Sequence, residues 1–260
     1  MRLSAIENIQ SRFRNWVAET CDQTPLIYFT RVFAAIWLVY DAIDLSQSQI
    51  LTNFWFMGAP IQPQLVIASQ IGVIVCEVGM LIGFYPRLFA LGAVIARAAL
   101  AVKFPLNDYS YFCVTALILS QCKFAERKAW PRDILVLQTA WIYFTSAILK
   151  MNPSFFRGGD LYVRQNYVAA VLPFPYPSFY RNWIADIHND ALMAGLGIAI
   201  ELLLAGTLFF WWRLTWRRGV FRGLSILLAA SVHLYAAYAL NVFFFGASIL
   251  AQVIFMTQES

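Results

Sequence analysis

The chain has 260 residues, of which 60% are hydrophobic and only 13% are charged, and its mean hydropathy is +0.62. Soluble globular proteins carry about 25% charged residues, so this composition excludes an ordinary soluble domain, a disordered chain and a basic domain that binds nucleic acid. The net charge of +5 comes from Lys and Arg that lie mostly between apolar segments, where such residues orient helices in a bilayer. We therefore predict an all-α integral membrane protein.

The first 24 residues predict an amphipathic helix in the membrane interface. They mix apolar and charged positions and lack the continuous apolar region of a cleavable signal peptide. Apolar residues recur at helical spacing, from Ile6 through Phe13 to Val17. Residues 25–260 follow as a single predicted transmembrane domain.

Seven apolar segments follow the amphipathic region, and about 20 helical residues cross a membrane. They are residues 26–45, 65–84, 88–104, 109–121, 134–149, 191–212 and 224–256. The last is too long for one untilted crossing, and Asn241 near its middle indicates two short helices. We predict a bundle of seven or eight transmembrane helices. Small residues would let these helices approach closely: Gly79, Gly83, Gly92, Ala96, Gly195, Gly197 and Gly206.

The distribution of Lys and Arg between the loops favours a cytoplasmic N-terminus. The cytoplasmic side then holds twelve of them: Arg2, Arg12, Arg14, Arg87, Lys123, Arg127, Lys128, Arg132, Arg213, Arg217, Arg218 and Arg222. The outer side holds five: Lys103, Lys150, Arg157, Arg164 and Arg181. The outer side also holds the long stretch 150–190, which we expect to cap a pocket or to serve only as an interfacial anchor.

Charged side chains within the hydrocarbon are costly, so each needs a partner or a function. Arg97, Glu77 and Glu201 are the deepest such residues. A structural ion pair of Arg97 with Glu77 or Glu201 is one interpretation, and a path for protons or a polar substrate is the other. Asp41 and Asp44 are expected near the outer end of their helix, within reach of water.

Lys150 ends an apolar helix and has two interpretations. As an anchor, it would snorkel to the outer interface. In a dry pocket under the following loop, burial would favour the neutral amine, which could act as a base. Ser146, one helical turn earlier, is a candidate for a Ser–Lys nucleophile pair.

His233 lies on an aromatic helix and is either a packing residue or a functional one. The chain has two histidines, His188 in the predicted outer loop and His233, and their spacing indicates no metal cluster. Four cysteines without paired spacing are expected to be small buried apolar residues. We predict no metal.

Four segments share a residue pattern with one known family. Residues 143–150 run from an aromatic pair through small residues to Lys150, and an aromatic residue and a glycine follow. His233 precedes a phenylalanine-glycine run at 243–246, Glu201 fits an acidic position, and residues 107–112 fit an asparagine-rich helix start. These segments resemble, in the same order, the vitamin K-dependent γ-carboxylase-like HTTM membrane proteins.

The resemblance implies that Lys150 is the base that deprotonates a reduced quinone at the outer face. In the carboxylase, the strong base that then forms takes a proton from a glutamate, which captures carbon dioxide. His233 would join Lys150 in catalysis. The residues assigned to substrate binding are Asn107, Tyr109, Tyr143, Asn152, Arg157 and Glu201.

Two departures narrow the expected function. Tyr109 stands where the family motif has a histidine, and the chain ends soon after its last apolar segment, without the large region that recognises the carboxylase's protein substrate. We therefore do not expect glutamate carboxylation. Shorter bacterial HTTM proteins, including those that mature secreted toxins such as sporulation-delaying protein, are similar in size, which implies the bacterial cytoplasmic membrane.

The sequence favours two functions over a transporter, because no pair of helices has matched Gly or Pro interruptions in two halves of the chain. One is an enzyme that acts on a lipid-soluble quinol or a secreted peptide at the outer face. The other is a non-catalytic partner in the maturation or export of a hydrophobic peptide. The expected partners are the lipid bilayer and a small secreted peptide or a membrane or periplasmic protein, with no nucleic acid.

Overall fold

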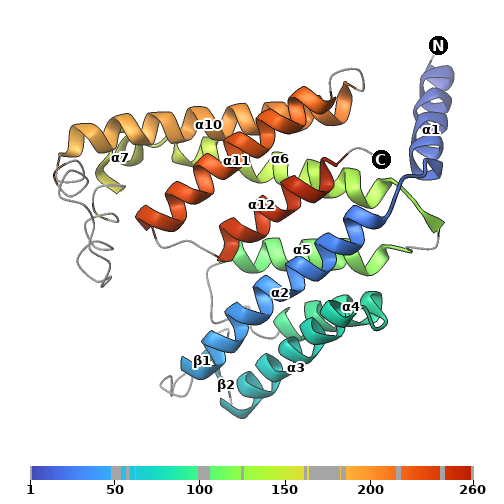
Figure 1. Cartoon of the computed structure of the whole chain (residues 1–260), viewed down its shortest axis with the longest axis horizontal. Coiled ribbons are helices and arrows are strands. Elements are labelled where there is room, and N and C mark those ends of the chain that lie inside the picture. Colours follow the sequence, from blue (N-terminus) through green and yellow to red (C-terminus); the bar gives the residue numbers. More distant parts are fainter. Residues whose placement is uncertain are drawn as a thin grey trace. The chain divides into compact units, whose positions relative to one another are not determined.

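The computed structural model describes residues 2–47, 54–56, 59–61, 63–98, 106–123, 126–160, 163, 182, 186–214, 218–240 and 244–258. Helices form nearly all of this part of the chain (Figure 1), and a two-stranded antiparallel hairpin of β1 (Phe54–Phe56) and β2 (Ala59–Ile61) is the exception. The predicted helical class is confirmed. The chain divides into two compact units, the first covering residues 1–135 and the second 136–259.

The first unit contains the N-terminal helices and the start of α6. Its helices are α1 (Arg2–Ala18), α2 (Thr24–Gln47), α3 (Pro63–Ile82), α4 (Pro86–Ala98) and α5 (Leu106–Gln121). Within it α3 packs against both α2 and α4, and α4 packs against α5. Buried aromatic rings of α2 and α5 form its core, with Phe33 stacked on Phe112 at a centroid distance of 5.2 Å.

A tight turn joins α3 to α4. Gly83 and Tyr85 have φ values of 81° and 40°, and Pro86 begins the next helix, where its missing N–H costs no hydrogen bond. A Cβ on Gly79 would overlap the ring of Phe89, and one on Gly92 would lie 2.9 Å from the Cys76 sulfur. These glycines therefore permit close packing of α3 and α4, as predicted.

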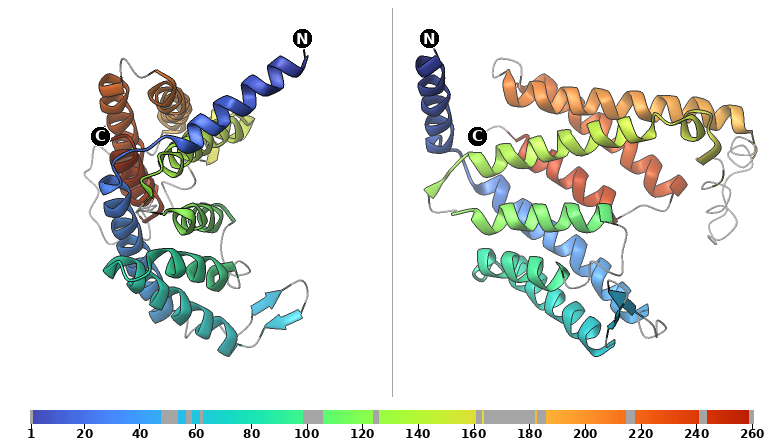
Figure 2. Two further views of the ribbon diagram at one scale, coloured as in Figure 1. Left: turned by 90° about the vertical axis from the view of Figure 1, so that its right-hand side faces the viewer. Right: turned by 180° about the vertical axis from the view of Figure 1, so that it is seen from behind.

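The second unit contains the rest of α6 (Trp130–Lys150), then α7 (Pro153–Phe156), α10 (Ile187–Arg213), α11 (Arg218–Leu240) and α12 (Phe244–Met256). Here α11 lies against α10 and α12 (Figure 2), and α7 contacts α10. The expected division of residues 224–256 into two helices is confirmed, although α11 begins six residues earlier. Among the described residues, nothing lies within 4 Å of a Cβ built on Gly195, Gly197 or Gly206, so close packing at the glycines of α10 stays a prediction.

In the part of the chain that the structure describes, four helices are long and apolar enough to cross a membrane. Their candidate spans are Thr24–Ile43, Gln64–Ile82, His188–Arg213 and Arg218–Ala236, and Ser110–Gln121 and Phe244–Met256 are shorter apolar helices. These spans support a membrane protein. The larger number of seven or eight crossings stays a prediction.

The stretch 150–190, expected to form a cap, lies largely outside the described residues. Its described end corrects one expectation, because His188 belongs to the first turn of α10 and not to a loop. The side chain of Asp186 accepts a hydrogen bond from the His188 backbone N–H at 2.9 Å and thereby caps the helix.

Candidate functional site

The second unit contains an ion pair between Lys150, the last residue of α6, and Glu201 near the middle of α10. Lys150 Nζ donates to Glu201 Oε1, and the Ser146 hydroxyl donates to the same oxygen at 3.3 Å. The Glu201 side chain is 6% exposed, whereas that of Lys150 is 34% exposed. The second carboxylate oxygen, Oε2, is buried and has no hydrogen-bond partner among the described residues. The carboxylate is therefore the buried member of the pair.

This contact differs from the solitary dry amine that the sequence suggested for Lys150. A carboxylate beside the amine supplies the counter-charge that a lone buried lysine would lack. The Phe155 ring adds a second contact for the cation, at 5.8 Å from Nζ. Any chemistry at Lys150 must therefore include Glu201.

A second polar contact lies earlier along α6. The Tyr143 hydroxyl is hydrogen-bonded to Nε2 of His233 on α11, and both side chains are buried. Gly246 of α12 packs on the other side of the imidazole, where a Cβ would lie 2.8 Å from Nδ1. The ring is thus held between the tyrosine and the α12 backbone.

The two contacts share one face of α6. Tyr143, Ser146 and Lys150 are separated by three and four residues, the spacings that align side chains on a helix. Tyr143 contacts His233 of α11 from this face, and Ser146 and Lys150 contact Glu201 of α10 from it. Side chains from α6, α10 and α11 therefore form a polar band in an apolar helical unit.

The first unit contains a separate buried ionic cluster. Arg97 on α4 pairs with Asp41 on α2 and with Glu77 on α3, the latter at 3.3 Å. Its guanidinium carbon lies 3.8 Å from the ring centroid of Phe112 and 4.7 Å from that of Trp37. The sequence interpretation named Glu77 as a partner of Arg97 and missed Asp41.

The expectation that water reaches Asp41 is wrong. The residue is only 2% exposed, because it lies on the face of α2 that turns toward Arg97. The sequence did contain one signal, the four-residue spacing of Trp37 and Asp41, which places both side chains on one face of α2. In the structure both side chains contact the guanidinium of Arg97.

The remaining predicted site residues have local roles or lie outside the described side chains. Asn152 caps α7 by accepting a hydrogen bond from the Phe155 N–H at 2.9 Å, and Arg157 is an exposed residue at the end of the same helix. Asn107 and Tyr109 lie in the first turn of α5, and their side chains are outside the described part of the structure.

The four cysteines are free thiols. Among the residues that the structure describes, no group of three or more His, Cys, Asp or Glu side chains is placed to hold a metal ion.

No family model, curated protein or solved structure matches the chain.

Proposed function

We propose that the protein is a membrane enzyme of the γ-carboxylase-like HTTM class, in which Lys150 and Glu201 transfer protons to and from a lipid-soluble quinol or a secreted peptide. The contact between these two side chains is the main support for the proposal. Buried ion pairs often stabilise a fold no better than apolar residues of similar size. A partly exposed amine beside a buried carboxylate, with one carboxylate oxygen unpaired among the described residues, suits the transfer of protons.

The proposed step begins with the pair in its charged form. Transfer of one proton from Lys150 to Glu201 leaves a neutral amine beside a neutral carboxylic acid. The amine then takes the proton of a quinol hydroxyl, which produces an oxyanion opposite the new ammonium group. In this step the proton moves within the pair before it leaves the substrate, so the base is the pair and not the lysine alone.

Tyr143 and His233 are proposed to hold the polar part of the substrate. Their hydroxyl and imidazole donate and accept hydrogen bonds on the same face of α6 as Lys150. Exposed apolar residues next to Lys150, such as Leu149, suit a substrate that approaches from lipid.

A non-catalytic partner for a hydrophobic peptide is the second candidate. One observation favours it, since the Lys150 side chain is one-third exposed, as an interfacial anchor would be.

Turnover by the full chain in liposomes, with a reduced naphthoquinone and dioxygen, distinguishes the two functions. We expect Lys150→Ala, Lys150→Arg and Glu201→Gln each to reduce quinol consumption by about 100-fold or more, because arginine stays protonated and glutamine takes no proton. The matched controls are Lys123→Arg and Glu126→Gln, since Lys123 and Glu126 form an exposed ion pair in the first unit.

Thermal unfolding of each variant separates a catalytic loss from a folding defect. The double variant Lys150→Ala/Glu201→Gln removes both charges and so avoids an unpaired buried carboxylate. Full turnover in Lys150→Arg would contradict the base role. Absence of quinol consumption in the wild type, with peptide maturation retained in Lys150→Arg, would instead support the non-catalytic function.

A further inference from the structure

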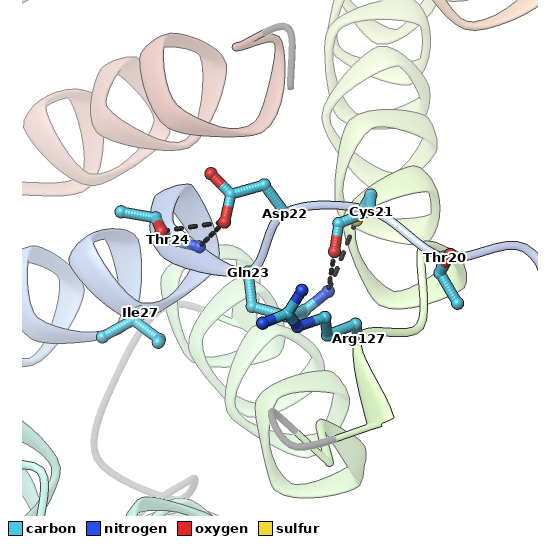
Figure 3. A pocket seen from close by; sticks show the side chains of 7 residues that line it. All are labelled: Thr20, Cys21, Asp22, Gln23, Thr24, Ile27 and Arg127. Atoms are coloured by element: carbon cyan, nitrogen blue, oxygen red, sulfur yellow. Dashed lines mark hydrogen bonds between the residues drawn. The ribbon is translucent and has the colours of Figure 1, made fainter.

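A cavity of about 460 Å³ lies where the linker between α1 and α2 crosses the turn before α6 (Figure 3). All of the cavity belongs to the first unit. Its lining residues are Thr20, Cys21, Asp22, Gln23, Thr24, Ile27 and Arg127.

Backbone hydrogen bonds between the two segments hold the walls of the cavity in place. Thr20 and Lys128 form an isolated antiparallel bridge, and the Cys21 N–H donates to the Arg127 carbonyl at 2.8 Å. The Gln23 side-chain amide donates to the Lys128 carbonyl at 2.9 Å. Arg127 is held at a φ of 50°, which side-chain-bearing residues rarely adopt. These contacts fix the backbone that lines the cavity.

One cation and one anion border the cavity without pairing to each other. Both Thr24 hydrogen bonds to Asp22, from the backbone N–H and from the hydroxyl, reach Oδ1, and the Asp22 side chain is exposed to solvent. No ion pair between Asp22 and Arg127 occurs among the described residues, and Figure 3 draws no bond between them. The Thr24 hydrogen bonds, with a smaller contribution from the Arg127 charge, hold the pKa of Asp22 below its usual range. Burial raises the pKa of the Cys21 thiol, so the thiol adds no charge at neutral pH.

The cavity lies at the boundary of a candidate membrane span. The first span begins at Thr24, and Ile27 extends the lining toward the apolar part of that helix. A ligand in this position has its polar part beside Asp22 and Arg127 and any apolar part beside α2. A phospholipid has the same arrangement, with its polar headgroup at the membrane interface and its acyl chains in the hydrocarbon core.

We propose that the cavity binds the headgroup of a phospholipid that carries a phosphate and a primary ammonium group. Arg127 contacts the phosphate, Asp22 accepts hydrogen bonds from the ammonium, and the first part of an acyl chain lies against Ile27. Opposite charges held apart suit a zwitterion, whereas a purely anionic headgroup would meet the Asp22 carboxylate. Free phosphoethanolamine has the same polar groups, but it would not use the apolar wall at Ile27.

Native mass spectrometry of the full chain, released from nanodiscs that contain equal amounts of ethanolamine, choline and glycerol phospholipids with the same acyl chains, tests the proposal. We expect the wild type to retain the ethanolamine lipid. Arg127→Gln should reduce its retention about three- to tenfold, the effect of losing one charge-assisted hydrogen bond at a partly exposed site. Asp22→Asn keeps an acceptor for Thr24 and should remove the preference over choline, whose methylated nitrogen has no N–H.

Arg12→Gln is the matched control, because it removes the same charge from an exposed residue of α1 that does not line the cavity. Thermal unfolding in lipid-free detergent should be the same for all four proteins. An equal loss of lipid in Arg12→Gln and Arg127→Gln would overturn the proposal, because it would show general attraction to charge. Equal retention of glycerol and ethanolamine lipids by the wild type, or full displacement by free phosphoethanolamine at equal concentration, would also overturn it.

Discussion

The hydroxyl of Tyr143 is hydrogen-bonded to Nε2 of His233 in the buried interior of the second unit. Tyr143→Phe keeps the ring and removes this contact, which leaves a buried imidazole nitrogen unpaired. We expect the free energy of unfolding to fall by about 1–3 kcal/mol, as measured by chemical or thermal denaturation in detergent. Tyr28→Phe, at an exposed position, should change it by much less. Equal effects of the two substitutions would show that the hydrogen bond contributes nothing.

Gly246→Ala tests whether the imidazole depends on close packing by α12. The added methyl group would lie 2.8 Å from Nδ1 and 3.2 Å from Cγ of His233, so the ring must move. We expect a loss of about 1–3 kcal/mol of stability. Gly206→Ala on α10 meets no described atom within 4 Å and should be neutral or stabilising, because alanine is the better helix former. The same loss in both variants would contradict this packing argument.

Arg97→Met leaves the carboxylates of Asp41 and Glu77 buried without their cation. We expect destabilisation of about 3–5 kcal/mol, seen as low yield of folded protein and early unfolding. The triple variant Arg97→Met/Asp41→Asn/Glu77→Gln removes all three charges and should recover much of that loss. Failure of this rescue would indicate that the packing of the guanidinium on Phe112 matters more than its charge.

The hydrogen bonds that Asp186 accepts at the start of α10 should make the stability of the protein depend on pH. Its carboxylate accepts hydrogen bonds from the His188 backbone N–H and side chain, which lower the pKa of Asp186 in the folded protein. A carboxyl group with a lowered folded-state pKa contributes stability above its ordinary pKa of 3.8, and that contribution disappears as pH falls below this value. We expect Asp186→Ala to unfold a few degrees earlier at pH 7 and to match the wild type near pH 2. A difference in midpoint that persists at pH 2 would contradict this origin of the stability.

The helices were largely predictable because apolar length is a local property of a sequence. The apolar run of α2 and the break before Pro86 needed no knowledge of neighbouring helices. Candidate site residues were also recognisable, because a charged or polar side chain in an apolar helix stands out. The partners were not predictable. Whether Glu201 meets Arg97 or Lys150 depends on which faces of the helices pack together. A single sequence does not show how each helix is rotated about its own axis.

The buried position of Arg97 has a consequence for biosynthesis. An arginine within a membrane helix is costly to insert, and Arg97 lies in the last turn of α4, which has only 13 described residues to offset that cost. Asp41 and Glu77 precede Arg97 in the chain, so both acids leave the ribosome before the cation. We expect α4 to be retained beside the translocon until α2 and α3 supply those acids. Neutralising both should lower the inserted fraction of α4 in a glycosylation-mapping assay, and unchanged insertion would mean that α4 enters the bilayer unaided.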